Sequence, residues 1–247
     1  MLRCERLTKS FDGVQALADI QLALPSSGII AIIGPNGAGK TTLFNVITGI
    51  LRPNFGKTFL GDKDITSLQP HLIARLGVAR TFQDLRFMRQ VSVSDNVMLA
   101  RPNQRGENFF YALTRIGVAK EEAVNRSVCM DLIRFVGLED KADRLAGELS
   151  YGQQKLLTLA CCIATGARIL LLDEPVAGVY PEMIEHILDF LLKLKVQDKL
   201  IVLVEHDLTA VRRVADQVIV MDEGHIIAEG PPVEVLARPE IMEAYVG

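Results

Sequence analysis

A glycine-rich run near the start of the chain has the residue types that bind phosphate. It matches the pattern G-x-x-x-x-G-K-[ST] and reads Gly34-Pro35-Asn36-Gly37-Ala38-Gly39-Lys40-Thr41. Its glycines allow successive backbone N–H groups to face one anion without Cβ clashes. Lys40 would contact the outer phosphates, and the Thr41 hydroxyl would bind Mg²⁺. The alternative is a simple glycine turn before a helix, but a strand-like segment precedes the run and a helical pattern follows it, as a phosphate-binding loop requires.

Two adjacent carboxylates later in the chain indicate the reactive part of the same site. Asp173 and Glu174 follow the apolar run Ile169–Leu172. The carboxyl ends of buried parallel strands face the ligand crevice of a wound sheet, and a carboxylate buried there without a cation is costly. We predict that Asp173 supports Mg²⁺ and that Glu174 polarises an attacking water. Alone, an Asp-Glu pair after a strand is also a common start of a helix.

A third motif, Leu149-Ser150-Tyr151-Gly152-Gln153, predicts the first turn of a helix. Ser150 would be the N-cap, and the Gln153 side chain would reach back to it in a capping box. The same turn carries Gly152, which has no side chain, at the positive end of the helix, where an anion can bind. The motif therefore predicts both a local structure and a second phosphate contact.

A wound α/β sheet is needed to bring these motifs together. Gly28–Ile33 is a predicted strand that leads through the glycine-rich run into a helix over Lys40–Gly49. Four more strands are predicted, and the last three lack polar alternation, as strands covered on both faces do. They are Val78–Phe82, Ile169–Asp173, Leu200–Val204 and Gln217–Met221.

Two regions depart from this rhythm. Residues 2–24 alternate more strongly between polar and apolar residues, and Lys57–Leu60 precedes the turn signal Gly61-Asp62, so both predict an antiparallel layer. Residues 84–165 are predicted to be mostly helical, with an amphipathic helix over Lys120–Phe135.

Composition restricts the class of protein. Hydrophobic residues make up 49% and charged residues 23%, and the net charge is −3, which gives no general basic field for nucleic acid. No apolar run approaches the roughly 20 residues of a membrane span, and the first residues lack the apolar core of a signal peptide. Cys4, Cys129, Cys161 and Cys162 show neither metal-ligand nor redox spacing, and the last two are expected to be reduced core residues of a cytosolic protein.

Together the motifs resemble those of the ABC ATPase family, in order and spacing and over essentially the whole chain. Gln83, in Thr81–Gln83, matches the family's Q-loop glutamine, which contacts Mg²⁺ and water. His206, in Val204–Asp207, matches the switch histidine that contacts the γ-phosphate. Phe11 matches the aromatic residue that stacks on adenine, although an ordinary core phenylalanine remains the alternative.

The resemblance implies an α/β fold: a P-loop NTPase (RecA-like) core with a mostly parallel sheet, an N-terminal antiparallel β layer and a helical subdomain. Residues 1–247 would form a single ABC ATPase domain, with the core at about 1–83 and 166–247 and the helical subdomain at about 84–165. The helical subdomain would carry the motif Leu149–Gln153, which resembles the signature sequence of the family and begins the signature helix.

The implied cofactors are ATP and Mg²⁺, and the implied site residues fall into three sets. The catalytic set is Glu174, His206 and Gln83. The metal set is Thr41, Gln83 and Asp173. The nucleotide-binding set is Phe11, Gly34, Pro35, Asn36, Gly37, Ala38, Gly39, Lys40, Thr41, Thr42, Ser150, Gly152 and Gln153.

In this family the signature helix binds the ATP held by the other subunit, so one chain has two half-sites and no complete one. Ser150 and Gly152 would serve the nucleotide of the second ATPase subunit, which is a copy or a sister chain. The other implied partners are two transmembrane permease subunits and, indirectly, an extracytoplasmic substrate-binding protein. The chain would lie at the cytoplasmic face of the membrane, held there by the permeases.

Finer features resemble the ATP-binding subunits of branched-chain amino-acid importers. They are Arg80–Gln83, Ala177-Gly178, Val204–Leu208 and the closing Ala244–Gly247. Two positions depart from that subgroup. Tyr180 stands where Asn or Asp is usual, in the loop that crosses the dimer interface, and Cys161 stands where arginine is usual.

Several alternatives stay open. Urea and short-amide importers share much of the pattern, and the lipopolysaccharide-export group has a similar loop after its paired carboxylates. A non-transport ABC ATPase of an assembly scaffold has a comparable length. A small-molecule kinase would also use a P-loop, but the signature helix and Glu174 favour hydrolysis.

The segment that follows Gln83 is the predicted contact with the permeases. It runs over Asp84–Val91 and carries four apolar residues among charged ones. The helical layer could bury them itself. In the family, however, this region lines a groove that receives a short helix of the membrane subunit, and Phe87 and Met88 are the best candidates for its anchors.

Overall fold

The computed structural model describes residues 1–81, 87–102, 104, 118–239 and 241. Two compact units divide the chain. The first comprises Met1–Arg80, Arg168–Ala177 and Pro181–Gly247, and the second comprises Thr81–Ala167 and Gly178–Tyr180. The assignment of these units as subdomains of one ABC ATPase domain stays a prediction.

The first unit is organised around a six-stranded sheet with the order β10-β9-β3-β8-β7-β6. All neighbours are parallel except β10 and β9. The bounds are β3 Gly28–Ile33, β6 Val78–Arg80, β7 Ile169–Asp173, β8 Leu200–Val204, β9 Gln217–Asp222 and β10 His225–Gly230. Residues of β7 and β8 are buried along their whole length, as expected for strands covered on both faces. The five predicted strands are confirmed, although β6 ends at Arg80 and Phe82 lies outside the described residues.

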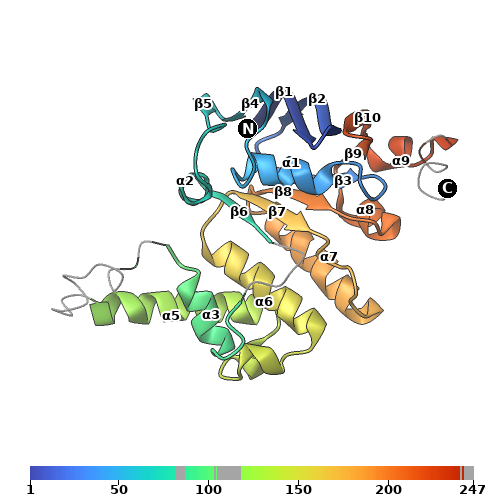
Figure 1. Cartoon of the computed structure of the whole chain (residues 1–247). Coiled ribbons are helices and arrows are strands. Elements are labelled where there is room, and N and C mark those ends of the chain that lie inside the picture. Colours follow the sequence, from blue (N-terminus) through green and yellow to red (C-terminus); the bar gives the residue numbers. More distant parts are fainter. Residues whose placement is uncertain (82–86, 103, 105–117, 240, 242–247) are drawn as a thin grey trace. The chain divides into compact units, whose positions relative to one another are not determined.

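Helix α1, Lys40–Ile47, lies between this sheet and a second sheet (Figure 1). Its Leu43 and Phe44 are fully buried in one apolar core with Leu7 and Ile30, which belong to the two sheets. The helix ends two residues earlier than predicted. The Thr48 hydroxyl donates a hydrogen bond to the Phe44 carbonyl, and Gly49 follows in the left-handed region with φ 71°, which closes the helix.

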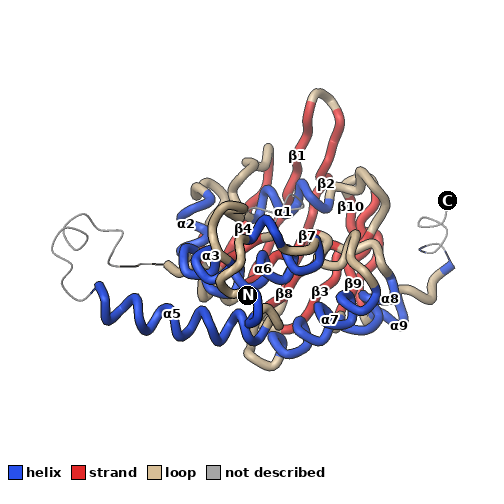
Figure 2. Tube along the Cα trace, turned by 90° about the horizontal axis from the view of Figure 1, so that it is seen from below, coloured by secondary structure: helices blue, strands red, loops and turns tan. Residues whose placement is uncertain are grey.

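The second sheet is the predicted antiparallel layer, with the order β2-β1-β4-β5. Its strands are β1 Leu2–Phe11, β2 Val14–Leu24, β4 Phe55–Leu60 and β5 Lys63–Asp64. Asp12 and Gly13, both with positive φ, form the tight turn of the β1–β2 hairpin, which Figure 2 shows extending beyond the neighbouring strands. The turn signal Gly61-Asp62 connects β4 to β5, as predicted.

The remaining helices of the first unit cover its sheets. They are α2 Pro70–Arg75, α7 Pro181–Lys195, α8 Leu208–Val214 and α9 Pro232–Val235. Helices α7 and α8 lie on the face of the six-stranded sheet opposite to α1 (Figure 1). Helix α7 buries one side, including Ile187, Leu191 and Leu194, because its apolar residues recur at helical spacing.

The second unit is helical, as predicted. It contains α3 Val93–Leu99, α5 Val118–Phe135 and α6 Tyr151–Ala164, with short 3₁₀ turns at Glu139–Lys141 and Ala146–Glu148. The three α-helices pack on one another through buried residues such as Val97, Ile133 and Leu156. Helix α5 confirms the amphipathic helix predicted over Lys120–Phe135. Within the described part of the chain, no helix combines the length and the apolar character that crossing a bilayer requires.

All four cysteines are free thiols, and three of them are buried. Burial raises the pKa of the Cys4 thiol to about 12. Cys162 is a core residue as expected, whereas Cys161 is only half-buried. Burial still raises the pKa of the Cys161 thiol to about 12, which keeps it in the unreactive thiol form.

Candidate functional site

The glycine-rich run forms a tight loop between β3 and α1. Gly34 and Gly39 have φ values of 149° and 97°, which favour glycine. A Cβ at Gly34 would lie 2.0 Å from the Met221 carbonyl oxygen, and one at Gly39 would lie 2.3 Å from the Ala16 carbonyl oxygen. The loop is therefore held between β2 and β9 on its way to the N-terminus of α1, in a conformation that requires glycine at these two positions. A Cβ at Gly37, in contrast, would meet no atom within 4 Å, so the exposed tip of the loop is open.

Lys40, the first residue of α1, is 94% buried and folds back along the loop. Its Nζ donates to the carbonyl oxygens of Gly34, at 2.6 Å, and Pro35, at 2.9 Å. Burial lowers the pKa of the Lys40 ammonium, and the nearby carboxylates of Glu174 and Asp173 partly oppose this shift. The lysine is thus a partly desolvated cation beside the loop, and an anion would stabilise its charged form.

Asp173 ends β7 and is held by a buried ion pair. Its Oδ2 lies 3.0 Å from Nη2 of Arg80, and the two side chains are only 6% and 5% exposed. The other guanidinium nitrogen of Arg80 donates to Oδ1 of Asn45 in α1 at 2.6 Å, and the guanidinium lies over the Phe44 ring. Arg80 comes from the neighbouring strand β6, so its guanidinium joins the end of β7 to α1.

Glu174 and His206 meet directly after the adjacent strands β7 and β8. Asp173 pairs with Val204 across these parallel strands, which places the next residues of both strands at the same sheet edge. The Nε2 atom of His206 lies 3.2 Å from Oε1 of Glu174, and both side chains are partly exposed. Glu174 has a φ of 49°, and its backbone N–H donates to the Val204 carbonyl at 2.9 Å. A carboxylate and an imidazole in this arrangement can orient a water and move a proton.

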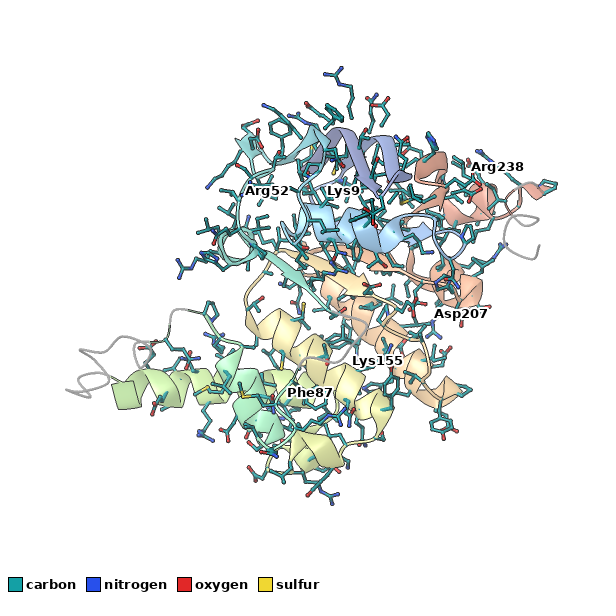
Figure 3. The ribbon with its side chains drawn as sticks, in the orientation of Figure 1. Lys9, Arg52, Phe87, Lys155, Asp207 and Arg238 are labelled. Carbon is teal, nitrogen blue, oxygen red and sulfur yellow. The ribbon has the colours of Figure 1, made fainter. Side chains whose placement is uncertain are left out.

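The predicted capping box is confirmed at the start of α6. The Gln153 N–H donates to Ser150 Oγ at 3.4 Å, and the Ser150 N–H donates to Gln153 Oε1 at 3.0 Å. One turn further along the helix, the ammonium of the buried Lys155, labelled in Figure 3, lies 5.5 Å from the centre of the Tyr151 ring. This helix N-terminus belongs to the second unit, whereas Lys40, Asp173, Glu174 and His206 belong to the first.

Residues 17–177, more than half of the chain, match the family described as ABC transporter. The chain belongs to the ABC transporter family. ATP-binding proteins of this family are ATPases, so this ABC protein binds and hydrolyses ATP. The predicted family, its activity and its nucleotide are thereby confirmed.

Curated relatives of this ABC ATPase match it over its full length. It is 36% identical to a probable branched-chain amino acid transport ATP-binding protein of Archaeoglobus fulgidus, with 100% of this chain and 95% of the relative covered. It is 34% identical to a high-affinity branched-chain amino acid transport ATP-binding protein of Pseudomonas aeruginosa and 35% identical to one of Escherichia coli K12, with 100% of this chain and 98% of each relative covered.

Solved structures confirm the predicted fold class. A crystal structure of a nucleotide-free ATP-binding cassette from an ABC transporter has a TM-score of 0.86 and 34% identity, with 100% of this chain and 99% of that chain covered. A structure of the ADP conformation of an ATP-binding cassette of an ABC transporter has a TM-score of 0.83 and 33% identity, with coverages of 100% and 98%.

The other predicted site residues of the ABC ATPase differ in how exposed their side chains are. Thr41 is exposed and Thr42 is half-buried in the first turn of α1. Phe11 ends β1 beside the hairpin turn, where it is 42% exposed and lies 5.0 Å from the Lys9 ammonium, so it is not a core residue. Gln83 lies outside the described residues.

The residues of the ABC ATPase fit Mg²⁺. Mg²⁺ prefers oxygen donors, and proteins usually hold it with one or two carboxylates together with substrate phosphates. Asp173 and Thr41 supply a carboxylate and a hydroxyl at the sheet edge and helix start that border the loop. Among the described residues, no group of three or more His, Cys, Asp or Glu side chains could hold a metal by itself.

Sequence reasoning missed two side chains that shape this site, Arg80 and Asn45. In the sequence Arg80 is only part of the subgroup motif Arg80–Gln83, whereas in the structure it neutralises the buried Asp173. A buried carboxylate requires a cation, but the sequence did not show which one, because only the pairing of β6 with β7 brings Arg80 to Asp173. Asn45 offered no signal, since a polar residue in a helix is ordinarily solvent-exposed.

Proposed function

We propose that this ABC ATPase powers the import of branched-chain or other amino acids across the cytoplasmic membrane. The observation that carries the proposal is its likeness, over its full length, to ATP-binding proteins of branched-chain amino acid transport. Its partners would be two permease subunits and a second ATPase subunit, with a substrate-binding protein outside the membrane. The chain would then lie at the cytoplasmic face, held by the permeases.

The phosphates of ATP would bind at the loop and at Lys40. The Lys40 ammonium would exchange the carbonyl oxygens of Gly34 and Pro35 for phosphate oxygens, and the burial of this cation favours that exchange. The open tip at Gly37 supports the approach of the phosphates to the backbone N–H groups. Phe11, partly exposed at the end of the hairpin strand, would stack on the adenine.

Thr41, Gln83 and Asp173 would hold Mg²⁺, which neutralises charge on the β- and γ-phosphates when it is bound. Glu174 would orient and polarise the attacking water, and His206 would contact the γ-phosphate. The distance of 3.2 Å between the His206 and Glu174 side chains supports roles at the same reacting atoms.

The nucleotide site would be completed by a second ATPase subunit. Ser150, Gly152 and Gln153 would bind the nucleotide held by that subunit, because the capped N-terminus of α6 presents backbone N–H groups and a glycine. ATP would therefore be part of the dimer interface, and its hydrolysis would separate the two subunits.

Reconstitution with the permeases tests this proposal. The chain is purified together with its two permease subunits and binding protein, placed in proteoliposomes, and supplied with ATP on its own side. We expect ATP-dependent uptake of labelled leucine that exceeds the uptake of labelled urea, since the relatives are named as ATP-binding proteins of branched-chain amino acid transport. Uptake of urea without leucine would assign the protein to an amide importer. Failure to assemble with any permease would favour an assembly-scaffold ATPase and contradict the proposal.

A further inference from the structure

Glu205 is a buried carboxylate at the carboxyl end of β8, one residue before the switch histidine. It is 3% exposed, and its backbone N–H donates to the Ile32 carbonyl of the adjacent strand β3 at 3.4 Å. Burying a carboxylate is costly unless its oxygens are hydrogen-bonded.

Each oxygen of Glu205 accepts a hydrogen bond from a different part of the site. The backbone N–H of Val176 donates to Oε1 at 2.9 Å, and the backbone N–H of His206 donates to Oε2 at 3.2 Å. Val176 lies two residues after Glu174, in the loop that leaves β7. One side chain therefore joins the loop that carries Glu174 to the segment that carries His206.

The backbone at Glu174 needs such support. Its φ of 49° is in the left-handed region, which non-glycine residues rarely adopt and which persists only where the surroundings enforce it. The Glu174 N–H donates to the Val204 carbonyl at 2.9 Å, and its carbonyl accepts from the Ala177 N–H at 3.3 Å. The contact between Val176 and Glu205 holds the same turn from the other side.

These contacts form a closed ring. It runs from the Glu174 side chain to the His206 side chain, along the backbone to Glu205, through its carboxylate to Val176, and back to Glu174. The residue after His206 is Asp207, labelled in Figure 3, which begins α8 and accepts hydrogen bonds from the Thr209 and Ala210 N–H groups. The helix start and the ring together leave the His206 backbone little freedom.

We propose that Glu205 is a positioning residue that fixes Glu174 and His206 relative to each other by accepting one backbone hydrogen bond from each of their segments. Its proposed role is exerted through these two backbone contacts. The inference rests on the proposed roles of Glu174 and His206. Only a carboxylate serves both contacts, because glutamine has the same shape but offers one acceptor oxygen, and its NH₂ group would face a backbone N–H.

The test compares Glu205→Gln with Glu229→Gln, which makes the same chemical change at an exposed position of β10. We expect Glu205→Gln to lower kcat for ATP by about 10- to 100-fold, as the loss of supporting contacts around catalytic groups typically does. We expect the affinity for a fluorescent ADP analogue to stay within about twofold, because the phosphate loop is unchanged. Glu229→Gln should match the wild type in both measurements.

A double-mutant cycle separates positioning from a general structural effect. If Glu205 acts through the histidine and glutamate pair, Glu205→Gln should lower single-turnover hydrolysis much less in a His206→Ala background than in the wild type. Equal effects in both backgrounds would overturn the proposal. So would a Glu205→Gln protein that loses ADP binding together with turnover, or one with unchanged kcat.

The inference and the proposed function fail in different ways. If Glu174→Gln retains turnover, the assignment of Glu174 is wrong and the ring has no catalytic role. If Glu174→Gln abolishes turnover while Glu205→Gln does not change it, the assignment of Glu174 stands and only the role of Glu205 is wrong.

Discussion

Replacing Arg80 with methionine removes the cation from a carboxylate that has almost no access to water. The Arg80 and Asp173 side chains are 5% and 6% exposed and lie 3.0 Å apart. Removing one partner of a buried ion pair costs about 3–5 kcal/mol, because the remaining charge is left uncompensated. Asn45 also loses its donor at 2.6 Å. Methionine keeps an unbranched side chain beside Phe44, so the change affects charge more than packing.

The expected cost corresponds to a large shift in thermal stability. For a chain of this size, each kcal/mol lowers Tm by about 2–4 °C, so we expect Arg80→Met to lower Tm by about 6–20 °C. Differential scanning calorimetry of the chain without nucleotide and without Mg²⁺ measures this shift. Arg134→Met is the matched control, since the side chains in the ion pairs of Arg134 with Asp131 and Glu139 are more than half exposed, and such solvent-exposed pairs contribute little to stability.

A second variant tests whether the uncompensated charge of Asp173 causes the loss of stability. Adding Asp173→Asn to Arg80→Met removes the uncompensated charge and should restore a large part of the lost stability. The role of this ion pair in stability would be contradicted if Arg80→Met lowers Tm no more than Arg134→Met does, or if adding Asp173→Asn does not raise the Tm of Arg80→Met.

Three further predictions concern nucleotide binding and assembly. Burial holds the pKa of Lys40 below its ordinary value of 10.5, and bound phosphates would raise it again. At a pH between the pKa of Lys40 in the free protein and its pKa in the complex, ATP binding should therefore take up a proton and weaken as the pH rises. Calorimetry in buffers of different ionisation enthalpy measures this uptake, and its absence from the wild type, or its persistence in Lys40→Arg, would contradict the role of Lys40. Tyr180, which is 83% exposed, should tolerate Tyr180→Asn with an unchanged fold and a change in ATPase rate of several-fold at most; loss of ATP binding in this variant would show that its assigned place is wrong. Replacing both the half-buried Phe87 and the 58% exposed Met88 with Ser should weaken co-purification with the permease subunits while ADP affinity stays nearly unchanged. Unfolding of this variant would show that the two side chains are core residues, and normal assembly would place the permease-binding groove elsewhere.

Local patterns were sufficient to predict the elements that carry the site. The continuous apolar runs of β3, β7 and β8 have no polar alternation because both faces of the sheet are covered, and their predicted bounds agree with the structure. The capping box at Ser150 was predictable because both of its hydrogen bonds join residues three positions apart.

Contacts between distant residues could not be predicted in the same way. Arg80 and Asp173 are 93 positions apart, and Glu205 and Val176 are 29 apart, so only the order of the strands in the sheet brings each pair together. A glutamate before the switch histidine gives no sign in the sequence of whether it faces solvent or the loop after β7. The side chains that support the reacting groups were therefore the part of the site that required the structure.

The most direct test of the central claim is the ATPase rate of Glu174→Gln, measured together with nucleotide binding and association. We predict that turnover falls by about 100-fold or more, because no carboxylate then orients and polarises the water. ATP binding should persist, and sedimentation should show an ATP-dependent dimer, whereas the wild-type chain without nucleotide should be mostly monomeric. Near-normal turnover in this variant, or a tight wild-type dimer in the absence of nucleotide, would contradict the account.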